Sequence, residues 1–525
     1  MQRYIVTLDL GTSGPKVGLS TDKGQYLAHE IEFNDVIYPA GEEGAAEQHP
    51  DQWIESIKTA LARLLKNNNI GKEHIWAVCT TSQWSGTVPV DETGKHISNA
   101  VIWLDSRGAK YVKKVVGGGI EVDGYNIFKA LKYIKYTAGA PAQSGKDPIG
   151  HILFLKHERP DIYNKAHKFL EPIDYLQARL TGKICATYDS ITLHWVTDNR
   201  DIANVKYHDG LIKMSGIDRN KLPDLIPTNS VLGNVSAKAA EELGLSTSTI
   251  VVAGCGDVHS AAIGSGAVAD YQPHFYIGTS SWLVCHFPKK KTDLAHNMAT
   301  LPSAIPGRYM FINEQESAGS CIQFFRDKVL FRKDALTPEG FPQNYYGIMN
   351  DLAAEIMPGS EGLLFIPHLY GERSPVEDHY ARGAFYNLSL KHDRRHMIRA
   401  IMEGVALNGK WLLKYVEKNA GKKAEAVNLI GGGANSELWC QIIADIFNRP
   451  VRQMENPVIA NSQGAAYLAA HALGTMTIDE IAASARYKKE FTPNAANAAL
   501  YDKAFEEFLG YYNRNKKAHK RMNGQ

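Results

Sequence analysis

Two acidic residues stand where strand-like segments end, and the first, Asp9, could take part in phosphate chemistry. Asp9 follows the β-rich run Tyr4–Leu8 and opens the string Asp9-x-Gly11-Thr12-x-x-x-Lys16. A carboxylate in this position can hold Mg²⁺, small residues let backbone N–H groups reach phosphate oxygens, and a lysine neutralises remaining charge. A tight hairpin with Asp and Gly in turn positions explains the string equally well. Taken alone, the string predicts either a phosphate site or an ordinary turn.

The second acidic residue, Asp257, could act as a general base. It follows the buried run Ile250–Ala253 and the glycines Gly254 and Gly256. Beside two glycines, a carboxylate can approach a ligand closely and accept a hydroxyl proton. It could also cap the helix expected to begin near Val258, and the two roles are compatible. A dinucleotide-binding fingerprint would need a third glycine where His259 stands, so that interpretation fails.

A Gly-Thr turn recurs about half the chain later. Gly278 and Thr279 follow the strand-like run His274–Ile277 and precede another, Trp282–Cys285. A strand, a Gly-Thr turn and a strand at the start of each half indicate two domains of related design that face one cleft. The repeat makes a phosphate site at both turns the stronger interpretation.

Three consecutive glycines mark a third candidate site. Gly431 to Gly433 lie between the predicted strand Ala426–Ile430 and the predicted helix Glu437–Phe447. Such a junction permits a flat ring to lie against bare backbone, with the helix N-terminus favouring phosphate nearby. A plain turn between a strand and a helix rarely needs three glycines in a row.

Two other motifs carry no chemistry. The near-match to a phosphate-binding loop at Gly404 to Lys410 continues with Trp411 and lies in a helical pattern of apolar residues. His392 and His396 are spaced as a metal pair on a helix, but the charged residues between them favour an exposed polar face.

The elements that position these residues alternate between strand and helix. Pro50–Leu65 has the apolar spacing of an amphipathic helix, and Ile75–Cys79 is a buried strand by its apolar run. This alternation predicts an α/β fold. Near the C-terminus, 495–512 is predicted to be helical and the basic end 513–525 to be frayed. Lys289–Lys291 is predicted to be a surface loop.

Composition narrows the class of protein. The 525 residues carry a formal net charge of +2, with 44% hydrophobic and 22% charged residues, as in a globular protein of two or three domains. Near-neutral charge gives no support for a nucleic-acid or membrane partner, and no run reaches the roughly 18 apolar residues of a membrane span. The N-terminus meets Asp9 before a signal-peptide core could form, and the Cys residues form no C-x-x-C pair. We expect a cytoplasmic protein with reduced cysteines.

In this order the motifs resemble those of the FGGY carbohydrate kinases, in the actin/hexokinase-like ATPase superfamily. The resemblance covers nearly the whole chain, and seven motifs in the correct order make it specific. They are Asp9–Lys16, Trp103–Arg107, Gly254–Asp257, Gly278–Ser281, Phe365–Pro375, Ala400–Gly404 and Gly431–Trp439.

The resemblance implies a fold and a reaction. The fold would be α/β, with two ribonuclease-H-like domains of the actin-like ATPase type and an interdomain active-site cleft. The reaction would transfer phosphate from ATP with Mg²⁺ to a hydroxyl of a sugar or polyol. The predicted divisions are residues 1–257 on the sugar and phosphate side, 258–485 on the adenosine side, and a C-terminal helix and basic tail over 486–525.

The resemblance also implies roles for individual residues. Asp257 would be the catalytic proton acceptor and Asp9 would organise Mg²⁺. The remaining residues divide into an ATP set and a sugar set: Gly11, Thr12, Ser13, Lys16, Gly278, Thr279, Gly432, Gly433 and Asn435 for ATP; Gln83, Trp84, Ser85, Asp105 and again Asp257 for the sugar.

Substrate identity depends on the segment Gln83-Trp84-Ser85-Gly86. Glycerol kinases carry an Arg-Glu pair where Trp84 and Ser85 stand, so a glycerol kinase is disfavoured. Xylulokinases usually show Q-M-H-G here and Asn after the catalytic Asp, where this chain has Val258. Trp84 could offer its flat face to a sugar or pack in the core.

The predicted substrate is a ketose, with the pentulose D-xylulose first and ribulose, a deoxy-ketose or the polyol erythritol as alternatives. A different class, a catalytically silent actin-like protein that binds nucleotide or sugar, predicts loss of Asp9 or Asp257, yet both are present. We expect a homodimer.

Overall fold

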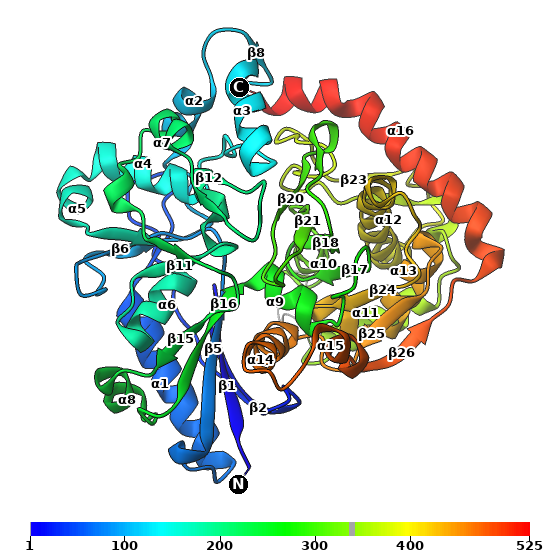
Figure 1. Ribbon diagram of the computed structural model, residues 1–525. Helices are drawn as coiled ribbons and strands as arrows, with labels where there is room; N and C mark the ends of the chain where they lie inside the picture. The colour runs from blue at the N-terminus through cyan, green and yellow to red at the C-terminus, as the bar shows by residue number, and fades with distance from the viewer. Residues whose placement is uncertain (1, 335–341, 525) are drawn as a thin grey trace.

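The structure is a computed structural model that describes residues 2–334 and 342–524 (Figure 1). Two sheets, one in each half of the chain, lie on either side of a central pair of helices. The first sheet has six strands and the second has eight. Together with their covering helices they form two α/β halves of related design.

The first sheet is built around parallel strands. Its strands, in spatial order, are β15 (Val231–Asn234), β16 (Ile250–Gly256), β5 (Ile75–Ser82), β1 (Tyr4–Gly11), β2 (Gly14–Thr21) and β3 (Tyr26–Ile31). β1 pairs in parallel with β5, and β5 with β16, whereas β1 and β2 form an antiparallel hairpin. The carboxyl ends of three parallel strands therefore meet at one edge.

Helices α1, α6 and α8 pack against one another along this sheet. The helices of the first half are α1 (Pro50–Asn67), α2 (Ala109–Val116), α3 (Ile127–Thr137), α4 (Pro148–Glu158), α5 (Pro160–Lys165), α6 (Pro172–Thr181), α7 (Asp209–Ser215), α8 (Ala237–Leu243) and α9 (Asp257–Gly264). As predicted for 50–65, α1 buries Trp53, Ile57 and Leu61 along one face.

The second sheet repeats the same plan. Its strands, in spatial order, are β19 (Thr292–Asp293), β20 (Met298–Pro302), β21 (Tyr309–Ile312), β18 (Ser281–Phe287), β17 (Pro273–Ile277), β24 (Val427–Ile430), β25 (Val451–Met454) and β26 (Tyr487–Phe491). The hairpin β17–β18 stands where β1–β2 stands in the first sheet, and β17, β24 and β25 are parallel. The predicted repeat of one design in both halves is therefore confirmed in the order and direction of the strands.

The second half also contributes long helices. They are α10 (Gly319–Phe325), α11 (Tyr345–Ala354), α12 (Arg394–Ala420), α13 (Glu437–Phe447), α14 (Ala460–Ala472), α15 (Ile478–Ser484) and α16 (Ala498–Asn523). α12 contains Gly404 to Lys410, so that segment is helical, as predicted. The prediction of an exposed face at 392–396 is wrong for His396, which is buried and forms a capping box with Asp393 at the start of α12.

Short two-stranded ladders complete the fold. They pair β4 (Glu47–Gln48) with β7 (Ala100–Val101), β6 (Val88–Val90) with β10 (Lys168–Leu170), β8 (Glu121–Val122) with β9 (Tyr125–Asn126), β11 (Cys185–Thr187) with β14 (Asp224–Ile226), β12 (Thr197–Asp198) with β13 (Lys206–Tyr207), and β22 (Leu364–Ile366) with β23 (Ala384–Tyr386). Lys289 lies exposed between β18 and β19, in the predicted surface loop.

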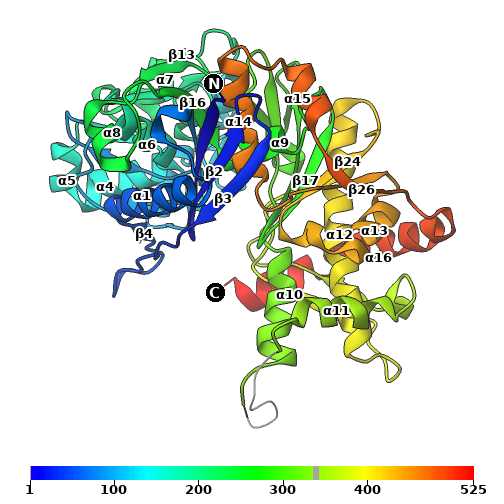
Figure 2. The same cartoon turned by 90° about the horizontal axis from the view of Figure 1, so that it is seen from below.

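The helices α9 and α14 exchange sides between the halves (Figure 2). α14 comes late in the chain but packs on β1, β5 and β16 of the first sheet. α9 follows directly from the first sheet, and its Ala261 and Ala262 share a cluster with Trp282 and Ile430 of the second sheet. The predicted boundary at residue 257 falls on the first residue of α9, and it stays a prediction.

The last helix differs from what the sequence suggests. α16 runs from Ala498 to Asn523 along the outer edge of the second half (Figure 1). The prediction that the basic end 513–525 is frayed is therefore wrong up to Asn523, whose side-chain amide donates to the Tyr380 carbonyl at 3.0 Å. No helix in the described ranges is long and apolar enough to cross a membrane.

Candidate active site

Asp9 and Asp257 lie at the edge where the parallel strands of the first sheet end. Asp9 is 1% exposed, faces Thr81 of β5, and has the Lys16 ammonium 3.4 Å from its Oδ2. Lys16 is its antiparallel partner on β2, so the hairpin register brings cation and carboxylate together. Asp9 raises the pKa of Lys16, which therefore stays charged.

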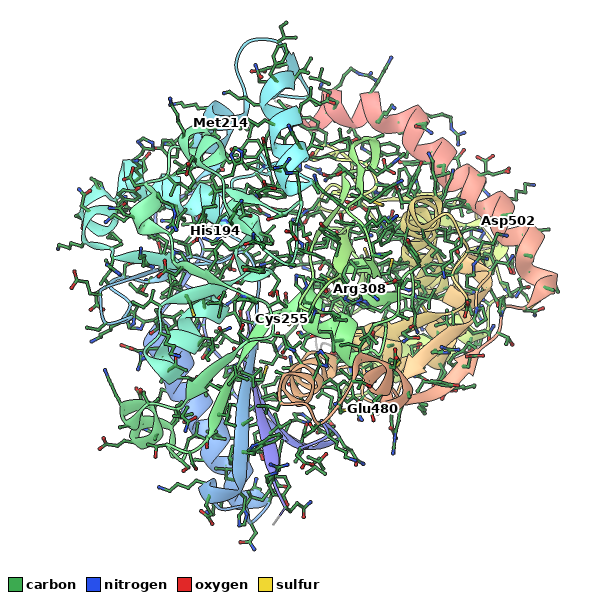
Figure 3. The ribbon with its side chains drawn as sticks, viewed as in Figure 1. His194, Met214, Cys255, Arg308, Glu480 and Asp502 are labelled. Atoms are coloured by element: carbon green, nitrogen blue, oxygen red, sulfur yellow. The ribbon has the colours of Figure 1, made fainter. Side chains whose placement is uncertain are left out.

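Asp257 follows β16 as the first residue of α9. Cys255, two positions earlier, lies between the two halves in Figure 3. Gly256, rather than Asp257, is the N-cap of α9, so the predicted capping role is wrong; the Asp257 Oδ1 instead accepts the N–H of Val258 at 2.9 Å. Burial, followed by the negative charge of Asp9, raises the pKa of Asp257 to about 7. A carboxylate with this pKa can accept a proton near neutral pH.

The first Gly-Thr turn is held by three side chains. The Thr12 carbonyl accepts from Gln48 Nε2 at 2.8 Å, and the Thr12 hydroxyl accepts from Trp103 Nε1 at 2.9 Å. The same hydroxyl donates to Gln83 Oε1 at 3.1 Å. Gln83 is 2% exposed, so its role in this structure is to tie the turn after β1 to the segment after β5. Ser13, at the tip of the turn, is exposed.

The second Gly-Thr turn is supported from behind by α10. The Gly278 carbonyl accepts from the Gly319 N–H at 2.8 Å, and the Thr279 carbonyl accepts from Ala318 at 2.9 Å. Thr279 itself is exposed. Just before this turn, Tyr276 stacks on Trp282 with ring centres 3.9 Å apart. Burial, followed by the charges of Asp257 and Asp9, raises the pKa of Tyr276 to about 12. Sequence analysis missed Tyr276.

The three glycines lie directly against the second Gly-Thr turn. A Cβ on Gly431 would meet the Ile277 carbonyl at 2.5 Å, and one on Gly433 would meet the Ile277 side chain at 2.5 Å. Gly432 is exposed, and a Cβ there would meet nothing within 4 Å. Asn435 closes the turn by donating to the Gly432 carbonyl at 3.2 Å. Bare backbone beside a phosphate turn fits a nucleotide that runs from Gly432 towards Gly278.

Trp84 and Ser85 follow β5, and Trp84 packs beside the end of β16. Trp84 is 9% exposed, and its ring meets the ring of His259 edge to face, with ring centres 4.9 Å apart. Its Cγ lies 2.9 Å from where a Cβ on Gly256 would be. It therefore packs behind the end of the strand that carries Asp257. The Ser85 hydroxyl donates to the Lys146 carbonyl at 2.9 Å.

Asp105 is fully buried. Its Oδ2 accepts from the Ala46 N–H at 2.9 Å and pairs with Arg107 at 2.7 Å, and Arg107 reaches Glu47 at 2.7 Å as well. In this structure Asp105 orders the loop around it. Its contact with a sugar stays a prediction.

Sequence analysis missed Asp147 and Glu171, each of which precedes a proline at the start of a helix. An acidic residue before such a proline usually indicates an N-cap, but neither side chain caps its helix. The Asp147 Oδ2 instead accepts from Trp195 Nε1 at 2.7 Å and from the Ala142 N–H at 3.0 Å. The Glu171 Oε2 accepts from the Gly86 N–H at 2.8 Å.

Glu171 interacts electrostatically with both Asp147 and Asp257. Burial raises the pKa of Glu171 well above its usual value, and the charges of Asp174, Asp147 and Asp257 raise it further. Burial also raises the pKa of Asp147, while Arg373 from the second half lowers it. Glu171 therefore links Asp147 and Asp257 into one interacting set of acidic groups.

One known protein family matches both halves of the chain. The FGGY family of carbohydrate kinases matches over residues 4–264 with its N-terminal domain and over 275–473 with its C-terminal domain. The chain belongs to this family. The protein is therefore a carbohydrate kinase, a phosphotransferase with an alcohol group as acceptor, and the predicted fold class is confirmed.

Relatives with different names are similar to this chain. A xylulose kinase of Staphylococcus epidermidis is 27% identical over 98% of both chains. An autoinducer-2 kinase of Yersinia enterocolitica is 28% identical over 97% of this chain and 94% of its own. The crystal structure of a gluconate kinase from Lactobacillus acidophilus superposes with a TM-score of 0.86 at 24% identity, covering 99% of this chain and all of that chain.

Proposed function

We propose that the protein phosphorylates a hydroxyl of a neutral ketose with ATP, a pentulose such as D-xylulose first, and that Asp257 is the general base. The raised pKa of Asp257 beside Asp9, at the edge between the two halves, is the observation that carries this proposal. A hydroxyl attacks phosphorus well only when its proton has an acceptor, and Asp257 would supply one.

The other predicted residues would hold the nucleotide. Gly432, Gly433 and Asn435 would lie against the adenosine, and the turns Gly11 to Ser13 and Gly278 to Thr279 would present backbone N–H groups to the phosphates. Asp9 would hold Mg²⁺, which supplies charge neutralisation when bound, and Lys16 would add a fixed positive charge. Phosphoryl transfer needs this positioning and neutralisation more than it needs a nucleophilic side chain.

The charge of the sugar side favours a neutral substrate over an acidic one. Among the described residues, the basic side chains that interact with the carboxyls there are Lys16, Lys146 and Arg373. Lys16 already pairs with Asp9, and Arg373 pairs with Glu314 and with Glu316 at 2.9 Å. Burial raises the pKa of Asp147, Glu171, Asp257 and Glu314, so a negative charge is costly in this region. A sugar acid such as gluconate would bring one more negative charge, at further cost in free energy at low dielectric. The relative named as a gluconate kinase therefore does not decide the substrate.

The test is ADP release with MgATP and a panel of acceptors. The panel contains D-xylulose, ribulose, a deoxy-ketose, erythritol, glycerol and gluconate, with Asp257→Asn as the blank. We expect a neutral pentulose to respond most strongly and the variant to lose on the order of 10²–10⁴ in rate. Gluconate as the best acceptor would refute the neutral substrate, and weak release that persists in Asp257→Asn would refute the base.

A further inference from the structure

Three side chains of types that can ligate a metal converge at the surface of the first half. His49 and Asp51 stand at the start of α1, and His96 lies between β6 and β7. One ligand atom from each lies within 4.8 Å of the other two, and across residues 2–334 and 342–524 this is the one such group of three His, Cys, Asp or Glu residues. The proposed kinase reaction does not use them.

The geometry of His96 suits a metal ligand. Its Nε2 lies 3.6 Å from Asp51 Oδ2, and its ring meets the ring of His49 edge-on at 5.4 Å. Its Nδ1 lies 3.1 Å from the hydroxyl of Tyr175, a residue that is completely buried. Metal-binding histidines are usually oriented by such a bond from their second nitrogen.

Arg179 contacts both the Tyr175 hydroxyl and Asp51. The Arg179 NH1 donates to the Tyr175 hydroxyl at 3.0 Å. A metal on Nε2 of His96 would place the proton on Nδ1, which could then donate to the same hydroxyl, since a hydroxyl oxygen has two lone pairs. The same NH1 lies 3.8 Å from Asp51 Oδ1, so Oδ2 is the oxygen that faces His96.

The two histidines differ in how firmly they are held. A neutral imidazole is the form that ligates a metal, so binding would release any proton that either ring carries. His49 is exposed, and the 3.3 Å bond that its Nδ1 accepts from the Asp51 N–H is at the long end of the range.

We propose that His49, Asp51 and His96 bind one divalent transition-metal ion, for which Zn²⁺ is the best match. Two imidazole nitrogens and one carboxylate oxygen, with water in the remaining position, are a ligand set typical of zinc. Gln48, the residue before His49, donates to the Thr12 carbonyl at 2.8 Å. Metal binding at the start of α1 is therefore expected to stabilise the segment that holds the first phosphate turn.

The experiment is calorimetric titration of the metal-stripped full-length protein with ZnCl₂ in the absence of nucleotide. We expect one equivalent to bind, with at least about tenfold weaker affinity in His49→Ala and in His96→Ala. His74→Ala is the matched control, because His74 also lies beside an acidic residue, Glu73 at 3.7 Å, but outside the group of three.

Two outcomes would overturn the proposal: no zinc binding by the unmodified protein, or equal binding in all three variants. His49 is exposed, so His49→Ala keeps the test valid if His96→Ala folds poorly. Titration with Co²⁺ gives a second readout, since ligation by His49 and His96 adds visible absorption bands that both variants would lose. None of these measurements depends on kinase activity, so failure here leaves the proposed function untouched.

Discussion

At the scale of the residue, the burial of Asp257 lowers the stability of the folded protein once the side chain ionises. Its pKa of about 7 in the folded protein lies well above the value of 3.8 for a solvated aspartate. The folded state therefore binds more protons than the unfolded state between about pH 4 and pH 7, and stability falls as pH rises through that window. Ionisation of Asp257 therefore lowers the free energy of unfolding.

Asp257→Asn is expected to raise the melting temperature while it abolishes turnover. Asn does not ionise, so its advantage over wild type should appear above about pH 4, grow up to about pH 7 and stay constant above it. Differential scanning fluorimetry at pH 5 and pH 8 measures this difference. Asp502→Asn on α16, labelled in Figure 3, is the control: it removes an exposed carboxylate that pairs with Lys410 at 2.7 Å and should not raise the melting temperature. A gain at pH 5 equal to that at pH 8 would contradict the burial of this charge.

Asp147 is expected to bind a hydroxyl of the sugar. Its Oδ2 is held by Trp195 and Ala142, and its Oδ1 has no hydrogen-bond partner among residues 2–334 and 342–524. Asp147→Asn keeps the shape and can still accept those two bonds. We expect the sugar KM to rise about 10- to 100-fold, the 1.5–3 kcal/mol of a hydrogen bond to a charged group, with the ATP KM unchanged. A rise in the ATP KM alone would place Asp147 outside the sugar site.

At the scale of the element, the turn after β24 contains a glycine whose role in binding nucleotide can be tested without a change in the stability of the fold. A Cβ on Gly432 meets no protein atom within 4 Å, so Gly432→Ala should leave the melting temperature unchanged. If adenosine lies against this backbone, the methyl group should raise the ATP KM and leave the sugar KM unchanged. Initial rates with either substrate varied make the distinction. An unchanged ATP KM would remove Gly432 from the nucleotide site.

The crossing of α9 and α14 depends on two glycines. A Cβ on Gly464 would lie 1.8 Å from the Ser260 carbonyl, and one on Gly264 would lie 1.8 Å from the Ala460 carbonyl. Gly464→Ala should therefore force the helices apart and cost at least about 1–3 kcal/mol, as overpacking does. Urea unfolding measures the loss, with Gly432→Ala as the control that adds the same methyl group in open space. Equal stability of the two variants would show that this crossing tolerates separation.

A site residue or helix end can be predicted from the sequence when residues next to it in the chain determine its structure, and not when distant residues do. Asp9, Asp257 and the glycine turns were recognisable because strand ends and their chemistry are encoded in consecutive residues. Asp147 and Glu171 were not, because each stands before a proline as an N-cap would, and only distant partners such as Trp195 and Gly86 redirect the side chains. The same reason explains the helical end of α16, where Asn523 donates to the carbonyl of Tyr380, a residue distant in the sequence.

At the scale of the whole molecule, each half lacks a layer that the other supplies. α14 covers Ile5, Ala77 and Val252 of the first sheet with alanines and Leu468. Nothing local in the sequence announces this exchange, because α14 follows the strands of the second sheet in the chain. A fragment that ends before α14 would expose an apolar sheet face.

Fragments 1–269 and 270–525 are therefore expected to be soluble only together. Residues 1–269 produced alone should aggregate, and co-production with 270–525 should recover a soluble complex. Size-exclusion chromatography and thermal melting of the fragments and of the mixture measure this. A fragment 1–269 that is monodisperse and melts cooperatively by itself would show that the first half does not need α14.

The exchange of α14 also sets an order of events during protein synthesis. The first sheet is complete in sequence once β16 has left the ribosome, but its covering helix is about 200 residues further along the chain. At about 5–20 residues per second, the nascent first half waits roughly 10–40 s with one apolar face uncovered. During that interval it would be a natural client for chaperones, and the sheet edge at Asp257 would receive its covering helix only when synthesis is almost finished.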